Sequence, residues 1–152
     1  MFKCLHMKVI RATPDHLAQL SQLFDLYRVF YEQTSNLDAA KAFLKDRFRN
    51  SDSIIFIAIA SDGTGLGFTQ LYPSFSSVSM MSTYILNDLF VTSEARKKGV
   101  GEALIAKAKH VVISQGAKGL TLETALDNPA QKLYVRLGFT KDSDVNHYTW
   151  QV

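Results

Sequence analysis

Hydrophobic residues in the first third of the chain recur at the spacing of helices. A short strand is predicted at residues 7–12, and Thr13 and Pro14 then form a typical helix start, because threonine caps free amides and proline suits the first helical position. Apolar side chains follow every three or four residues and predict a helix that ends near Tyr31. The same spacing predicts a second helix over residues 37–48.

The middle of the chain has the pattern of strands. Residues 54–60 are a continuous apolar run rich in β-branched side chains, which is typical of a strand buried on both faces. A turn at residues 61–65, Ser-Asp-Gly-Thr-Gly, predicts a hairpin with a partner strand at residues 66–72. After a serine-rich loop, residues 83–91 form the next predicted strand.

Helices and strands alternate in the last third. A helix is predicted from Val100 to near Gly116, a strand at residues 120–124, a helix at residues 129–137 and one or two closing strands at residues 140–151. The element order β, α, α, β, β, β, α, β, α, β predicts an α/β layered fold, called α+β in some schemes.

Composition excludes several classes of protein. The 152 residues suit one domain, residues 1–152, and residues 1–6 read as an N-terminal extension. With 47% hydrophobic and 20% charged residues the chain is not of the disordered type. A net charge of +3 suits an anionic ligand, but no basic run interleaved with aromatics supports nucleic acid binding. No apolar run approaches the ~20 residues of a membrane span, and Cys4 is the single cysteine, so we expect the reducing cytoplasm.

The segment that joins the strand at residues 83–91 to the next helix carries the most informative chemistry. Residues 96–101 read Arg-x-x-Gly-x-Gly. The glycines permit a tight turn and leave backbone amides uncovered at a helix N-terminus, where the amides and the helix dipole favour an anion. Arg96, Lys97 and Lys98 add positive charge, so a pyrophosphate fits this turn. The P-loop run GxxxxGK[ST] is missing, and so is the third glycine of GxGxxG.

A second motif follows the predicted strand at residues 120–124. Asn128 starts a helix and Gly138 ends it, with Tyr134 between them. Strand, Arg-x-x-Gly-x-Gly, helix, strand and Asn…Leu-Tyr…Gly-Phe, in this order, closely resemble the paired cofactor motifs of the GNAT superfamily of N-acetyltransferases. Residues 86–91, Leu-Asn-Asp-Leu-Phe-Val, are similar to the central strand of that family.

The resemblance covers the whole chain and implies a fold, a cosubstrate and a catalytic acid. It implies a mixed, mostly antiparallel sheet of six to seven strands flanked by about four helices. It also implies direct transfer of an acetyl group from acetyl-CoA to an amine, without a metal. Tyr134 matches the family's tyrosine that faces the thioester sulfur and would protonate the departing thiolate. The residues implied to bind coenzyme A are Leu89, Phe90, Val91, Arg96, Lys97, Lys98, Gly99, Val100, Gly101, Glu102, Ala103 and Asn128.

Two positions depart from the family pattern. Asn128 precedes Tyr134 by six positions instead of the usual seven, so Asp127 is an alternative contact to the cofactor. Some relatives place a basic glutamate in the central strand, where this chain has Ile85 and Asn87.

The general base therefore has to be sought elsewhere. Asp88 is adjacent to those positions, but strand alternation turns it to the opposite face. Glu123 is the preferred candidate, because ribosomal-protein N-terminal acetyltransferases carry a glutamate at the matching place, and a water chain is a third option.

The acceptor pocket is implied to lie between the first two helices and the loop of the middle strands. Aromatic walls and a carboxylate there suit a small cationic amine or a peptide amine. The chain looks most like the small-molecule amine branch of the family, and many members form homodimers. A non-catalytic module that binds acetyl-CoA is the alternative function. The candidate acceptor residues are Tyr27, Tyr31, Glu32, Tyr72 and Phe75.

Overall fold

The computed structural model describes residues 6–152, so the predicted extension lies outside the described residues except for His6. The predicted order of elements is confirmed as far as the last helix. In chain order the elements are β1 (Met7–Arg11), the 3-10 helix η1 (Pro14–His16), α1 (Leu17–Phe30), α2 (Leu37–Asn50), β2 (Ile54–Ala60), β3 (Gly65–Ser76), β4 (Met81–Val91), the 3-10 helix η2 (Ser93–Ala95), α3 (Val100–Ser114), β5 (Leu120–Thr121) and α4 (Gln131–Arg136).

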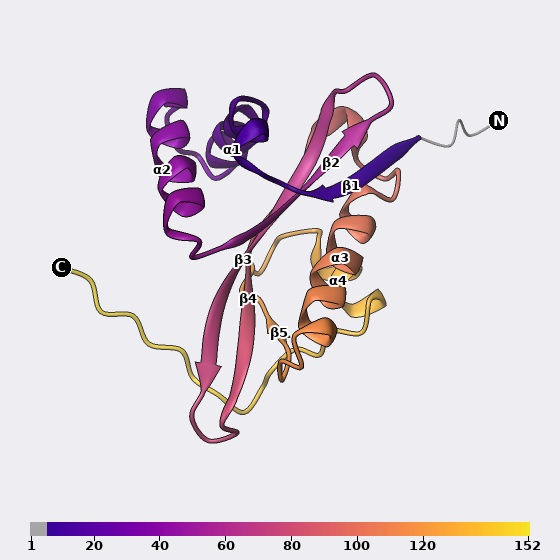
Figure 1. The fold of residues 1–152 in the computed structure, drawn as a ribbon. Coiled ribbons are helices and arrows are strands. Elements are labelled where there is room, and N and C mark those ends of the chain that lie inside the picture. Colours follow the sequence, from indigo (N-terminus) through magenta and orange to yellow (C-terminus); the bar gives the residue numbers. More distant parts are fainter. Residues whose placement is uncertain (1–5) are drawn as a thin grey trace.

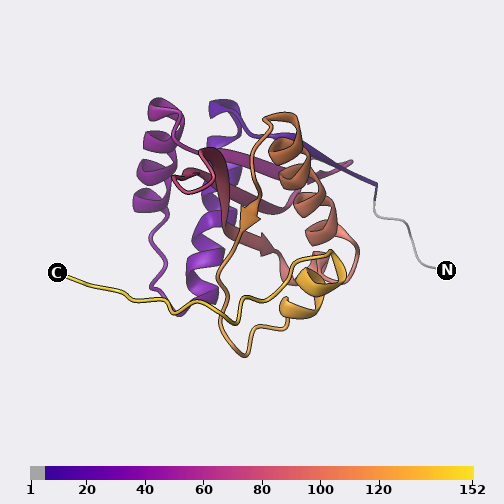
Figure 2. The ribbon, with the colours of Figure 1, turned by 90° about the horizontal axis from the view of Figure 1, so that it is seen from below.

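Within residues 6–152 five strands form one sheet in the order β1-β2-β3-β4-β5. Neighbouring strands are antiparallel except β4 and β5, which run parallel. Helices α1 and α2 cover one face of the sheet, and α3 and α4 cover the other (Figures 1 and 2). The predicted mixed sheet with four helices is confirmed.

The prediction of six to seven strands is wrong. Residues 140–152 are exposed, form no strand, and project away from the body of the molecule in Figure 1. The physical reason is the short edge that β5 offers. Only Leu120 and Thr121 pair with β4, so few aligned backbone groups remain on which a further strand could build.

The sheet separates two hydrophobic cores. Strand β2 serves both, because Ile55 and Ile57 pack with α1 and α2, whereas Phe56 and Ala58 pack with α3. This arrangement explains why the apolar run of β2 is continuous rather than alternating. The most completely buried large side chains are Leu20, Leu44, Ile57, Phe68, Leu71, Leu104 and Ile105.

A β-bulge in β4 changes which face its side chains occupy. Gln70 pairs with Asp88 and Leu71 with Leu86, so Asn87 is an extra residue on β4. Asp88, which follows the bulge in the chain, lies on the α1 side of the sheet. Leu86, which precedes the bulge, packs in the core on the α3 side. Simple alternation put Asp88 on the face opposite Ile85, and that prediction is wrong because the extra residue brings both onto the same face.

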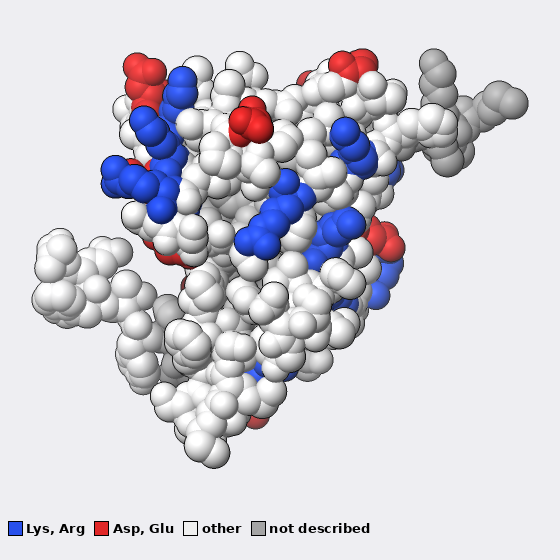
Figure 3. All heavy atoms as spheres, viewed as in Figure 1, with Lys and Arg blue, Asp and Glu red and all other residues white. Residues whose placement is uncertain are grey.

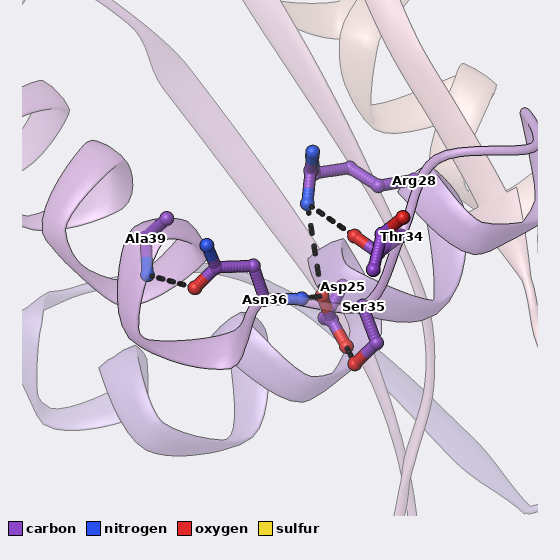
Figure 4. Close-up of polar contacts among 6 residues, drawn as sticks. All are labelled: Asp25, Arg28, Thr34, Ser35, Asn36 and Ala39. Carbon is purple, nitrogen blue, oxygen red and sulfur yellow. Dashed lines mark hydrogen bonds and ion pairs between the residues drawn. The ribbon is translucent and has the colours of Figure 1, made fainter.

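Asp25 holds the corner between α1 and α2. Its carboxylate accepts hydrogen bonds from the Ser35 hydroxyl (2.6 Å) and the Asn36 backbone amide (2.7 Å), and lies 3.9 Å from the Arg28 guanidinium (Figure 4). The Ser35 bond, then the Asn36 bond, hold the pKa of Asp25 below its ordinary value. Asn36 in turn caps α2 by accepting a bond from the Ala39 amide (3.0 Å). The carboxylate therefore orders the chain between the two helices.

Replacing Asp25 with Asn is expected to lower the free energy of unfolding by about 1–3 kcal/mol at pH 7, since the amide group cannot accept both hydrogen bonds. A carboxyl group whose pKa is lowered by folding stabilises the folded protein at pH values above its pKa in the unfolded state. This stabilisation is lost as the pH falls through the lowered pKa of the folded state. The difference from wild type should therefore shrink in acid. Urea unfolding from pH 7 to pH 3 measures it, with the exposed Asp15→Asn as control. Equal stability of both variants at pH 7 would contradict this role.

Candidate active site

The turn between β4 and α3 presents a row of free backbone amides. Lys97 (φ 59°) and Gly99 (φ 82°) adopt the left-handed conformation, and α3 begins at Val100 without a side-chain cap. The backbone amides of residues 97–102 donate no hydrogen bond to any residue within 6–152. Amides in this state at a helix start, together with the helix dipole, favour an anion such as a phosphate.

Positive side chains surround this turn, but they are not equivalent. Lys97 and Lys98 are exposed. Arg96 instead lies back along β4, where its Nε donates to the Val91 carbonyl (3.0 Å) and its guanidinium lies 5.4 Å from the centre of the Phe30 ring. Seen as in Figure 1, Lys and Arg side chains lie over α2 on one side of the molecule and over α3 and the strands beside it on the other, and acidic side chains are fewer (Figure 3).

Tight packing joins the start of α3 to β4 and α4. A Cβ atom on Gly101 would lie 3.3 Å from Leu133 of α4 and 3.8 Å from Val91. Glu102, the residue after Gly101, forms an ion pair with Arg136 of α4 (2.8 Å). The helix that carries the free amides is therefore fixed against the helix that carries Tyr134.

Strand β4 has a free edge beside this turn. It pairs with β5 only at Tyr84 and Ile85, so Leu89, Phe90 and Val91 have no strand partner on that side. A free edge of this kind can hydrogen-bond an extended amide-containing ligand in the manner of an added strand.

Tyr134 is buried in the core on the α3 side of the sheet, in the cluster that contains Leu86 of β4 and Ile105 of α3. Its ring packs edge-on against Phe139, with centroids 5.9 Å apart. Burial raises the pKa of Tyr134 to about 12, and the nearby Tyr31 adds to the rise. Tyr31 directly follows α1, the helix that packs on the other face of the sheet.

The side-chain oxygen of Asn128 forms a hydrogen bond within its own turn. Its Oδ1 accepts a hydrogen bond from the Ala130 amide (2.9 Å), which orders the turn before α4. The neighbouring Asp127 is exposed. The side-chain amide of Asn128 donates no hydrogen bond to a residue in the described range, so it is free for a ligand.

Glu123 lies apart from Tyr134 and from the glycine turn. Its side chain is 79% exposed, and its carboxylate lies 3.3 Å from Nδ1 of His147 in the C-terminal segment. The structure does not bring this predicted base into contact with the other predicted catalytic residue.

Three of the five predicted acceptor residues gather on the α1 side of the sheet. The rings of Tyr27 and Tyr31 lie 5.1 Å apart, and Tyr72 lies beside Gln70 on β3. Glu32 is exposed just after α1, and Phe75 is exposed on the distal part of β3. The predicted set is therefore divided between an aromatic cluster and exposed positions.

The residues that sequence reasoning missed or set aside lie within this aromatic cluster. Asp88 is 4% exposed and Gln70 is fully buried. The Gln70 amide donates to Asp88 Oδ2 (2.7 Å), and the Asn87 amide donates to Asp88 Oδ1 (3.1 Å). Burial raises the pKa of Asp88, while hydrogen bonds from Gln70, Tyr27 and Asn87 oppose the rise. A glutamine inside the apolar run of β3 was the available signal.

Residues 6–152 contain no cluster of three His, Cys, Asp or Glu side chains placed to share a metal ion. None of the helices in the same range combines the length and apolar character needed to cross a membrane.

Comparisons with known proteins identify the family of this chain. Residues 19–139 match the Acetyltransferase (GNAT) family. A Bacillus subtilis protein named "Uncharacterized N-acetyltransferase YhfO" is 47% identical over 147 residues, 96% of this chain and 98% of that protein. The aminoglycoside N(6')-acetyltransferase type 1 of Klebsiella aerogenes is 32% identical over 60% of this chain and 62% of its own length. A solved structure of a probable acetyltransferase has a TM-score of 0.90 and 39% identity, covering 95% of this chain and 97% of that one.

The family match spans the glycine turn and Tyr134. The chain therefore belongs to the GNAT acetyltransferase family and is an N-acetyltransferase.

Proposed function

We propose that this enzyme transfers the acetyl group of acetyl-CoA to a primary amine of a small molecule by direct attack of the amine. The observation that carries the proposal is the row of free amides at residues 97–102, fixed against the helix that holds buried Tyr134. An anion-binding turn, a free strand edge and a buried phenol then follow one another along β4 and α4. This spatial order suits a ligand with a pyrophosphate at one end and a thioester at the other.

Each part of coenzyme A has a matching group. The amides of residues 97–102 would bind the pyrophosphate, with Lys97 and Lys98 beside it. The free edge at residues 89–91 would bind the pantetheine arm, once Arg96 releases the Val91 carbonyl. The free side-chain amide of Asn128 would make a further contact.

Tyr134 would act as the general acid. Its raised pKa keeps the phenol protonated at neutral pH, so a proton is available when the thiolate leaves. The ordinary pKa of a thiol is about 8.5, so proton transfer from a phenol of pKa about 12 is uphill, and it requires the phenol to be held against the sulfur as the thiolate forms.

Glu123 would act as the general base through a bound water. By the alternation that starts in β5, it lies on the face opposite Leu120 and Leu122, which pack in the core on the α3 side. That face is the acceptor side of the sheet. Its exposure leaves room for a water between carboxylate and amine.

A small cationic amine is the acceptor class we propose. The cluster of Tyr27, Tyr31 and Tyr72 offers aromatic faces to a cation. The aminoglycoside acetyltransferase that is 32% identical to this chain is named for polyamine-like sugars, which belong to the same class.

Measurement of thiol release from acetyl-CoA tests this function. The panel would contain polyamines, aminoglycosides, amino acids and peptides with free N-termini, and mass spectrometry would identify the acetylated product. Amine-dependent release is expected. Binding of coenzyme A without release for any amine would instead support the alternative, a non-catalytic acetyl-CoA-binding module. Formation of a homodimer stays a prediction that light scattering can check.

Tyr134→Phe is expected to lower kcat by about 10²-fold or more, because it removes the proton donor while keeping the ring in its packing. The KM for acetyl-CoA should change little. Tyr148→Phe is the matched control, since Tyr148 is exposed in the C-terminal segment. Full activity of Tyr134→Phe would exclude the acid role.

Glu123→Gln is expected to remove the acidic limb of the pH profile of kcat/KM, because a glutamine has no carboxylate to deprotonate. His147→Gln breaks the same ion pair but keeps the carboxylate, and it should retain the limb. An unchanged profile for Glu123→Gln, or the same change in both variants, would rule out the role of base.

A further inference from the structure

Asp88 is a buried carboxylate with hydrogen-bond donors but without a cation. Gln70 and Asn87 donate to its two oxygens. The ion pairs found within residues 6–152 do not include it. Buried charges in proteins are normally paired, because neutral donors alone compensate only part of the lost hydration.

A second buried acceptor beside Asp88 also lacks a partner. The amide nitrogen of Gln70 donates to Asp88 (2.7 Å) and to the Tyr72 hydroxyl (3.2 Å). Its Oε1 is buried and has no hydrogen-bond partner within the described range. Leaving such an oxygen unsatisfied costs about 1–3 kcal/mol, so a group that donates to it is expected.

Aromatic rings enclose this pair of acceptors. Tyr27 lies edge-on to Phe68 (5.8 Å) and to Tyr31 (5.1 Å), and Tyr72 contacts Gln70. Tyr31 lies close enough to Tyr134 to raise its pKa. Asp88 and Gln70, which these rings adjoin, are at most 4% exposed, whereas Tyr31 at the end of the cluster is 44% exposed.

We propose that Asp88 and Gln70 Oε1 form the subsite that binds an alkylammonium group of the acceptor. An ammonium carries three N–H donors and a positive charge, which match a carboxylate, an amide oxygen and aromatic faces. The exposed Asn87 at the bulge borders Asp88 on the solvent side. The inference rests on the proposed function, since it names the acceptor's cation, and it assigns to Asp88 a binding role without proton transfer.

The subsite predicts that Asp88 lowers stability when no cation is bound. Burial raises its pKa, so the folded state binds more protons than the unfolded state, and stability falls as pH rises from the ordinary value of 3.8 through the folded pKa. The titratable groups that face Asp88 are Tyr27 of α1 and Tyr72 of β3; Arg47 and Asp52 act on Tyr72. Burial raises the pKa values of both tyrosines, so Tyr27 and Tyr72 stay protonated over that range.

Asp88→Asn tests the proposal, because the amide has the same shape but no charge. At pH 7 the amide loses one of the two accepted hydrogen bonds but also removes a buried charge without a cation, so the melting temperature should fall less than in Asp25→Asn. The KM for the amine should rise about tenfold or more, while the KM for acetyl-CoA stays unchanged. Asp15→Asn, on the exposed η1 turn, is the control expected to leave both values unchanged.

A binding measurement keeps this test separate from catalysis. Calorimetry should show that wild type binds 1,6-diaminohexane and that Asp88→Asn binds it with an affinity lower by about tenfold or more. The uncharged control 1,6-hexanediol should bind neither wild type nor the variant. Gln70→Met, which removes Oε1 at similar volume, should weaken diamine binding as well. Equal diamine affinity in wild type and Asp88→Asn would overturn the subsite, as would a fall in kcat at unchanged amine KM. If the diamine binds as expected but no amine is acetylated, the proposed function fails and the subsite stands.

Discussion

The pairing of β3 with β4 is the constraint on which both parts of the site depend. The two strands pair from Gly67 with Val91 to Ser76 with Met81, and a Cβ atom on Gly67 would lie 2.4 Å from the Phe90 carbonyl oxygen. This close approach holds the end of β4 in place at the point where the chain turns into the free amides. Because β5 pairs with β4 only near its middle, the other edge of that same segment stays open to a ligand.

The bulge at Asn87 divides the site between the two faces of the sheet. One extra residue places Asp88 toward α1, while Leu86 remains in the core on the α3 side. In the proposed reaction, acceptor and cofactor would approach from opposite sides of the sheet. Tyr31, which follows α1, raises the pKa of Tyr134 in α4, so the two helical layers come close here. The proposed direct transfer needs this convergence, because it uses no enzyme group to carry the acetyl between two sites.

Two aspartates show how environment decides the role of one residue type. Asp25 accepts bonds from Ser35 and Asn36 beside Arg28, and the pKa of its carboxyl is lowered, so the ionised form contributes to stability. Asp88 has neutral donors alone, and burial raises its pKa. A buried carboxylate without a cation, such as that of Asp88, adds little to the stability of the fold, whereas the proposed cation-binding site requires one.

Much of this protein follows from its sequence alone. The helix start at Thr13–Pro14, the glycine turn before Val100 and the order of elements through α4 are decided by capping, turn geometry and hydrophobic period, which act between residues close in the chain. The bulge at Asn87, the two-residue length of β5 and the unpaired state of residues 140–152 were not predictable in this way. The burial of Asp88 against Gln70 likewise emerged only from the fold. Such features depend on strand register and on contacts between distant segments, and only the tertiary structure brings those segments together.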